Sequence, residues 1–301
     1  MEHRIALSVI VPTYRSTPHF SLFFQRLVDE LCLLRLPCEI IVVDDGSGDG
    51  TPQLLRDLLK NSLPVGWKNG VSRGIQDNIL RVRIVFLREN SGQQQATLCG
   101  IRHASGKVMV TLDDDLQHPP DQIASLLRKL FEGYDLVYGV PQGRTASALR
   151  RFGSFLRDAL FLLLFGGRAY GIRPTSFRAF RRELADTLFG TAAPVDGTAG
   201  GQNVAELPRT RDKGVSPSEA PVESFLYLSA EFFRLTHRIS CISVRARQTD
   251  THHSRYPLAR LVRSFAGLAL YLPVFPRGLR RHYGGIRWVV EGVEEGELEC
   301  G

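Results

Sequence analysis

The sequence predicts an α/β fold in which helices cover both faces of one mostly parallel sheet. Two observations lead to this prediction. Short continuous runs of Val, Ile and Leu, which are typical of strands buried on both faces, recur through the first part of the chain. These runs alternate with segments of helical periodicity, and strands that alternate with helices build a parallel sheet.

The predicted elements follow one another in order. The first strand, residues 7–11, ends at Pro12, and the second, residues 39–43, ends at an Asp-Asp-Gly-Ser turn. Further strands are predicted at residues 82–87, 107–112 and 135–138, and helices at residues 20–34, 51–59, 93–104 and 119–131. Ligands bind at the carboxyl ends of the strands in such sheets, so polar clusters there are candidate site residues.

The chain changes character after this α/β part, residues 1–140. Residues 139–182 contain nine arginines and one acid, and residues 232–287 contain eleven arginines and one acid. We divide the remainder into a basic part of the same domain, a flexible Gly/Pro/Ser/Thr-rich loop and an acidic tail, at residues 141–290, 191–221 and 291–301. Basic amphipathic helices are expected at residues 149–165 and 258–275, either in a membrane interface or in the core.

Composition bounds the function. The 301 residues are 43% hydrophobic and carry a formal net charge of +7, which excludes a disordered or collagen-like chain and favours an anionic partner. The five cysteines form no C-x-x-C pair, which argues against a zinc site or a disulfide framework and fits a reducing cytosol. No signal peptide is expected, and no apolar stretch reaches the ~20 residues of a membrane span. Arginines without interleaved aromatic residues argue against nucleic-acid binding.

Three adjoining carboxylates follow the strand that ends at Leu112. Asp113 and Asp115 face the same way if the chain stays extended, and Gln117 adds an amide oxygen. Such hard oxygen ligands suit Mg²⁺ or Mn²⁺. The alternative is that the acids cap the next helix or lie in solvent.

Two further clusters lie at predicted strand ends. Asp44 can accept a hydrogen bond from a ribose hydroxyl or a base N–H, or it can belong to an ordinary turn. The segment Asn90–Ala96 opens a helix, whose N-terminus favours anions, although capping explains it nearly as well.

Four segments together resemble the family-2 glycosyltransferases, in particular the polyprenyl-phosphate glycosyltransferases, which include dolichyl-phosphate mannose synthases and undecaprenyl-phosphate sugar transferases. They are Val9–Tyr14, Val42–Ser47, Asn90–Gln93 and Leu112–Pro120. The resemblance covers residues 5–185 well and 223–280 loosely, and it implies the GT-A fold, which is related to the Rossmann fold.

The resemblance also implies roles for individual residues. It places Pro12, Tyr14, Asp44 and Asp113 at the nucleotide-sugar donor, and Asp113, Asp115 and Gln117 at the metal, with Asp115 and Arg151 as catalytic residues. Asp114 would be a neighbour of the metal ligands. The acceptor phosphate would be bound by Arg144, Arg151, Ser154, Arg247 and Arg255. The chain departs from the family at Arg15-Ser16, where Asn-Glu is usual.

The predicted function is that of an inverting, metal-dependent hexosyl- or pentosyltransferase, which moves a sugar from a UDP- or GDP-linked donor to a polyprenyl phosphate. A lipid phosphate is already anionic near neutral pH and needs cations more than a base, which suits the arginine-rich half. We expect a cytoplasmic protein that is peripheral on the inner face of the membrane, with an integral membrane partner as one option. Two alternatives stay open: a saccharide acceptor, which would need a general base such as Glu183 or Asp186, and a non-catalytic sugar-nucleotide-binding relative.

Overall fold

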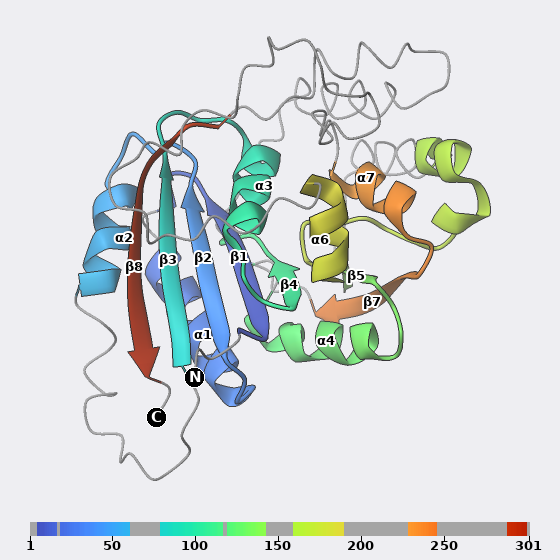
Figure 1. The fold of residues 1–301 in the computed structure, drawn as a ribbon, viewed down its shortest axis with the longest axis horizontal. Coiled ribbons are helices and arrows are strands. Elements are labelled where there is room, and N and C mark those ends of the chain that lie inside the picture. The colour runs from blue at the N-terminus through green and yellow to red at the C-terminus, as the bar shows by residue number, and fades with distance from the viewer. Residues whose placement is uncertain are drawn as a thin grey trace, which may run out of the picture.

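The computed structural model describes residues 5–16, 19–60, 79–116, 119–142, 159–189, 228–245 and 288–299. They form one eight-stranded sheet with the strand order β7-β5-β6-β4-β1-β2-β3-β8 (Figure 1). The strands are β1 (Leu7–Thr13), β2 (Cys38–Asp44), β3 (Ile79–Leu87), β4 (Val108–Thr111), β5 (Leu136–Gln142), β6 (Arg178–Arg181), β7 (Ile239–Arg245) and β8 (Val290–Glu299). The pairings make only β6 and β8 antiparallel to the other strands described, so the predicted α/β fold with a mostly parallel sheet is confirmed.

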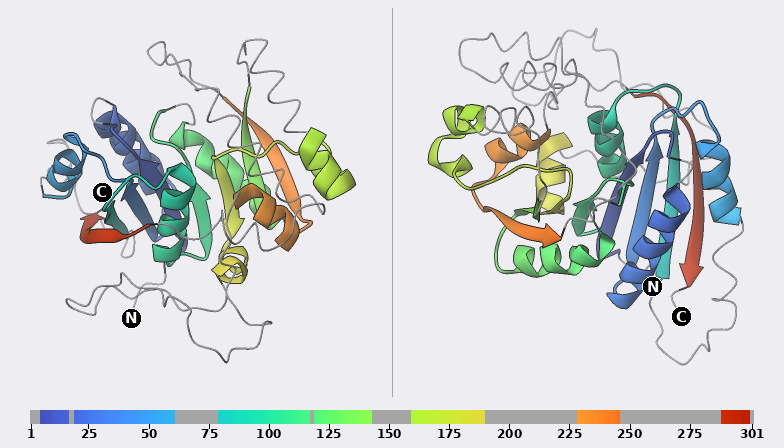
Figure 2. Two further views of the ribbon diagram at one scale, coloured as in Figure 1. Left: turned by 90° about the horizontal axis from the view of Figure 1, so that it is seen from above. Right: turned by 180° about the vertical axis from the view of Figure 1, so that it is seen from behind.

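Helices cover both faces of the sheet, as Figure 2 shows from two further directions. The helices are α1 (Phe20–Leu33), α2 (Thr51–Lys60), α3 (Gln93–His103), α4 (Ile123–Phe131), α6 (Arg182–Phe189) and α7 (Leu228–Leu235), with 3₁₀ turns η2 (Pro120–Gln122) and η3 (Gly166–Ala169). Residues 159–165 are also helical.

Alternating side chains of the buried strands divide the core into two clusters. Val9 and Val11 of β1 pack with α1, α2 and α4, whereas Ile10 packs on the other face with α3, α6 and α7. Alternation of successive side chains across a strand makes each apolar run serve both faces. This explains why the strands of the first half read as continuous apolar runs.

The last strand was not expected from the sequence. Residues 291–301 were predicted to be an acidic tail, but most of them form β8, which pairs with β3 at the edge of the sheet. Its acids meet arginines of the α/β part: Glu294 lies 2.8 Å from Nε of Arg56, and Glu295 lies 2.5 Å from Nε of Arg83. Pairing with β3, together with these ion pairs, attaches a polar strand that has few apolar side chains of its own.

The structure describes only some of the segments predicted for the second half of the chain. The loop 191–221 and the helix 258–275 lie outside the described residues, and of the helix 149–165 the structure describes 159–165. No helix among the described residues is long and apolar enough to cross a membrane. The sequence predicts no disulfide framework; Cys32 is nevertheless disulfide-bonded, whereas Cys38, Cys99 and Cys241 are free.

Candidate active site

The carboxyl ends of β1, β2 and β4 meet at one rim of the sheet. Thr13, the last residue of β1, is in register with Asp44, the last residue of β2. The N–H of Asp45 donates to the carbonyl of Thr13 at 2.9 Å, and β4 ends beside β1 at Thr111. The rim therefore carries the carboxylates at residues 44–45 and 113–115, and we call it the acidic rim.

The triplet at residues 113–115 does not continue the strand. β4 ends at Thr111, and the chain turns at residues 114–116, where Leu116 has a positive φ of 58°. The expectation that an extended chain aligns Asp113 with Asp115 is therefore not met. Because of the turn, the carboxylates contact different neighbours.

Asp113 and Asp114 are held by different parts of the fold. The amide Nε2 of Gln93 donates to Oδ1 of Asp113 at 2.5 Å, and Oγ of Ser176 donates to Oδ2 at 2.7 Å. Oγ1 of Thr13 donates to Oδ2 of Asp114 at 2.5 Å. Asp114 thus ties the triplet to the end of β1, which gives a structural reason for an acid at this position.

Burial and mutual repulsion make the acidic rim electrostatically costly. Burial, followed by repulsion from Asp113 and Asp115, raises the pKa of Asp114 to about 6. Burial also raises the pKa of Asp113, although the hydrogen bonds from Ser176 and Gln93 and the charge of Arg178 oppose it. A cation at the rim would offset this repulsion.

Asp44 and Asp45 are adjacent but face different partners. Asp45 accepts the N–H of Ser91 at 2.7 Å and that of Gly92 at 2.8 Å, so it fixes the loop before α3. Oδ2 of Asp44 accepts the N–H of Ser47 at 3.3 Å, whereas Oδ1 is buried and has no hydrogen-bond partner within the described chain. Burial raises the pKa of both carboxyls. Oδ1 of Asp44 is therefore a buried acceptor without a partner among the described residues.

Pro12 and Tyr14, the other residues predicted to bind the nucleotide-sugar donor, lie at the end of β1. Pro12 is buried, and the Tyr14 ring is 41% exposed, with the Arg15 guanidinium 5.1 Å from the ring centroid. Arg15 has a positive φ of 53°, and its N–H donates to Oγ of Ser47 at 2.9 Å. The backbone of Arg15, which departs from the family's first motif, thus connects the ends of β1 and β2.

Arg178 of β6 is a buried cation that the sequence analysis did not assign. Only 6% of it is exposed, and Nε donates to Oγ1 of Thr111 at 3.1 Å. A second guanidinium nitrogen donates to Oγ of Ser229 at 3.1 Å, and Cζ lies 5.5 Å from the centroid of the Phe232 ring. It lies in the arginine-rich residues 139–182, where nothing in the sequence pattern distinguishes a buried arginine from an exposed one.

Six of the predicted site residues lie outside the described residues, so their placement remains a prediction. They are the metal ligand Gln117 and the acceptor-side residues Arg144, Arg151, Ser154, Arg247 and Arg255.

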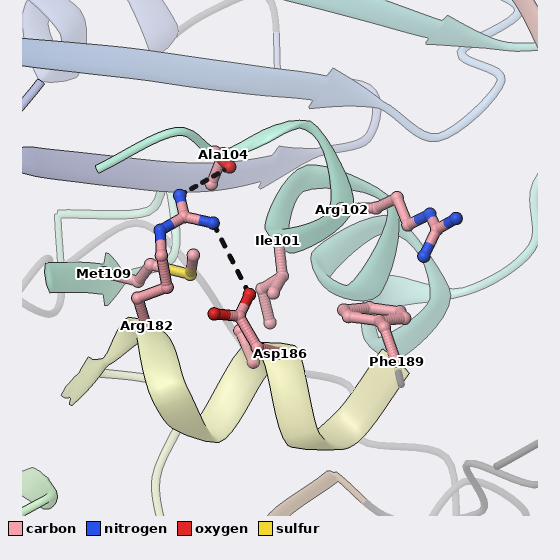
Figure 3. A pocket seen from close by; sticks show the side chains of 8 residues that line it. Ile101, Arg102, Ala104, Met109, Arg182, Asp186 and Phe189 are labelled. Carbon is pink, nitrogen blue, oxygen red and sulfur yellow. Dashed lines mark hydrogen bonds and ion pairs between the residues drawn. The ribbon is translucent and has the colours of Figure 1, made fainter. Parts of the chain in front are cut away.

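A pocket between α3 and α6 lies at the opposite end of α3 from Gln93 (Figure 3). Its polar side chains already serve the fold: Arg182 donates to the carbonyls of Gly106 and Ala104, both at 2.8 Å, and one of its nitrogens lies 3.6 Å from Asp186. Asp186, a candidate base for a saccharide acceptor, is therefore occupied by an ion pair away from the acidic rim.

The ligand set of the rim fits a hard divalent cation. Within the described ranges no group of three or more His, Cys, Asp or Glu side chains is placed so that it could hold a metal ion. Mg²⁺, however, commonly binds through one or two carboxylates together with substrate phosphates. Asp113 and Asp115 supply two such carboxylates, while Asp114 is turned toward Thr13.

Residues 8–189 match the model of a protein family described as Glycosyl transferase family 2. Undecaprenyl-phosphate 4-deoxy-4-formamido-L-arabinose transferases of Salmonella choleraesuis (strain SC-B67) and Enterobacter sp. (strain 638) are 30% and 32% identical over 182 residues. This match covers 60% of the chain and 50% of each relative, so the chain spans about half the length of the curated relatives it matches.

The fold is similar to that of glucosyl-3-phosphoglycerate synthase from Mycobacterium tuberculosis, which has been crystallised with phosphoglyceric acid. The TM-score is 0.55 at 20% identity, and the match covers 91% of this chain and 82% of the other. A further crystal structure of that synthase contains Mn²⁺, uridine diphosphate and glucosyl-3-phosphoglycerate. This likeness confirms the GT-A fold.

Proposed function

The chain belongs to glycosyl transferase family 2, and from this we propose that it acts as a glycosyltransferase. We propose that it transfers a hexose or a pentose from a UDP- or GDP-linked donor to a polyprenyl phosphate, with inversion at the anomeric carbon. The observation that carries the proposal is the acidic rim at the ends of β1, β2 and β4. The match to undecaprenyl-phosphate transferases supports the choice of acceptor.

In this proposal the donor nucleotide lies along the ends of β1 and β2. Oδ1 of Asp44 accepts a hydrogen bond from the base or the ribose, because a buried carboxylate oxygen without a partner is costly unless a ligand supplies one. The exposed ring of Tyr14 and the buried Pro12 border the base.

The donor diphosphate lies next to Asp113 and Asp115, which with Gln117 would hold Mg²⁺ or Mn²⁺. The ion, when bound, supplies Lewis-acid stabilisation of the charge that develops on the leaving diphosphate. The chain orients this part of the site: Gln93 and Ser176 fix the carboxylate of Asp113, and Thr13 fixes that of Asp114.

A lipid phosphate needs no general base, since its second pKa is ~6 and it is largely ionised at neutral pH. Arg144, Arg151, Ser154, Arg247 and Arg255 would position it. A saccharide hydroxyl would instead need a base. The ion pair of Asp186 with Arg182 speaks against that role for Asp186.

An exposed apolar patch suits an acceptor that is delivered from a membrane. Leu162, Leu163 and Tyr170, in and just after the helical residues 159–165, are 45%, 70% and 82% exposed. We propose that this patch contacts the bilayer, with the protein peripheral on the cytoplasmic face, alone or beside an integral membrane partner. Basic segments next to apolar ones are attracted to anionic lipid.

The direct test is a transfer assay with a panel of UDP- and GDP-linked sugars, undecaprenyl phosphate and Mn²⁺ or Mg²⁺, with the product identified by mass. With undecaprenyl phosphate as acceptor, we expect one of the donors to yield a sugar-linked undecaprenyl phosphate. With undecaprenol, which lacks the phosphate, we expect no product from any donor. Transfer to a saccharide but not to undecaprenyl phosphate would refute the acceptor assignment.

The membrane contact predicts an effect of Leu163→Glu. A charge in place of this exposed apolar side chain should oppose its insertion into the bilayer and weaken binding to vesicles of anionic lipid severalfold, as measured by co-sedimentation. Leu33→Glu on α1 is the matched control, since Leu33 is 74% exposed but lies outside the patch. Equal retention of both variants on vesicles would show that the patch does not contact lipid.

Asp44→Asn should separate stability from donor binding. Burial raises the pKa of Asp44 in the folded protein above its ordinary value of 3.8. The carboxyl therefore contributes to the stability of the fold below pH 3.8, where it is protonated, and this contribution is lost as the pH rises through the folded pKa. At neutral pH the neutral amide should therefore raise the free energy of unfolding, on the order of 1 kcal/mol, and the gain should shrink near pH 4. Donor affinity should fall at least tenfold. A variant that is less stable, or that binds UDP and GDP as tightly as the wild type, would contradict this role.

A further inference from the structure

The carboxylate of Asp113 is held on both oxygens by side chains from distant parts of the chain. Gln93, the first residue of α3, donates to Oδ1 at 2.5 Å, and Ser176, two residues before β6, donates to Oδ2 at 2.7 Å. A carboxylate offers about four lone-pair positions. The two bonds therefore fix the plane of the carboxylate and leave acceptor positions on both oxygens for a cation.

Ser176, the hydrogen-bond donor next to β6, is itself held rigidly. Oγ1 of Thr111, at the end of β4, donates to the carbonyl of Ser176 at 2.5 Å. The same hydroxyl accepts a hydrogen bond from Nε of Arg178 at 3.1 Å. The antiparallel pairing places Thr111 opposite Arg178, so the frame that holds Ser176 belongs to the sheet.

Gln93, the hydrogen-bond donor on α3, is anchored through the loop that precedes this helix. Asp45 accepts the N–H groups of Ser91 and Gly92, and Oγ1 of Thr97 donates to the carbonyl of Gln93 at 2.8 Å. Gly46 packs so closely on this loop that an added Cβ would lie 2.5 Å from the carbonyl carbon of Glu89. The end of β2 therefore determines where the amide of Gln93 lies.

We propose that Gln93 and Ser176 are positioning residues that hold the Asp113 carboxylate in the orientation needed for the divalent cation and the donor diphosphate. The inference rests on the proposed function and extends it, because it assigns the two residues a role in cation affinity. Hydrogen-bond partners that orient metal ligands typically contribute 10–100-fold to affinity or activity. If the pair only joined α3 to β6, its loss would change stability alone.

The test compares Gln93→Met and Ser176→Ala, which remove one hydrogen-bond donor each, with the wild type. Mn²⁺ binding is followed by electron paramagnetic resonance in the presence of UDP or GDP, next to the thermal midpoint Tm. We expect the Mn²⁺ affinity of each variant to fall 10–100-fold with little change in Tm. Ser176→Thr, which keeps the hydroxyl, should bind Mn²⁺ nearly as the wild type does.

Gln94→Met is the matched control on the same helical turn, since Oε1 of Gln94 accepts the N–H of Leu228 on α7 and does not contact Asp113. It should bind Mn²⁺ normally. Unchanged Mn²⁺ affinity in both test variants, or an equal loss in Gln94→Met, would overturn the inference while leaving the proposed function intact. A wild-type protein that binds neither Mn²⁺ nor a nucleoside diphosphate would overturn the proposed function itself.

Discussion

Asp113→Asn is expected to lower sugar transfer at least 100-fold, more than the ~10–100-fold that loss of an outer hydrogen-bond partner costs. The amide is a weaker ligand for a hard cation and carries no charge to offset it. The fold should survive, because burial raises the pKa of Asp113 and a neutral side chain is less costly there. The measurement is kcat/KM with the donor identified by the panel, at saturating Mn²⁺, together with Tm.

Asp186→Asn is the control for this substitution. The carboxylate of Asp186 pairs with Arg182 beside the pocket between α3 and α6, so we expect transfer to continue at a rate close to that of the wild type. Loss of transfer in Asp186→Asn and retention in Asp113→Asn would favour a base-assisted reaction with a hydroxyl acceptor and would contradict the account.

Gly46→Ala is expected to damage both the fold and the site. The added Cβ would lie 2.5 Å and 2.7 Å from the carbonyl carbon and Cα of Glu89, and 2.8 Å from the nitrogen of Asn90, all backbone atoms that cannot rotate away. The residue also has a φ of +66°, which is strained for alanine. We expect a loss on the order of 2 kcal/mol in the free energy of unfolding, measured by urea titration. Donor affinity should fall as well, because this loop leads directly into Gln93 at the start of α3.

Gly48→Ala tests whether this effect is specific. Gly48 lies in the same turn, an added Cβ there meets no atom within 4 Å, and its φ lies outside the left-handed region. We expect stability and donor binding close to those of the wild type. If both alanine variants behaved alike, the close packing of Gly46 on the loop would not be what orders the site.

The elements of the first half could be predicted from the sequence because each carries a local signal. Strands buried on both faces read as continuous apolar runs, and α1 and α4 show helical spacing of buried residues. The predicted bounds of α1 and α3 differ from the observed ones by a single residue at the C-terminal end. The short β6 gave no such signal, since its four residues, Arg178–Arg181, are half arginine. β8 is polar and is held by pairing with β3 and by Arg56 and Arg83, which only the folded sheet brings near.

The candidate site shows the same division. Asp44 and Asp113 could be predicted as candidate site residues because each follows an apolar run and lies in a segment that resembles the family. The partners of Asp113 could not, because Gln93 and Ser176 are 20 and 63 residues away in the sequence. The loop-holding role of Asp45 likewise depends on tertiary contacts with Ser91 and Gly92. The turn at residues 114–116 could not be anticipated from the sequence, because Leu116 has a positive φ, which an apolar residue rarely adopts.

The most direct measurement is calorimetric titration of the wild-type protein with UDP and with GDP, each with Mn²⁺ and with EDTA. If the acidic rim holds a divalent cation against a donor diphosphate, one nucleotide should bind with Mn²⁺ and bind at least tenfold more weakly in EDTA. Equal affinity for that nucleotide in Mn²⁺ and in EDTA, or no binding of either nucleotide, would contradict the assignment of these carboxylates.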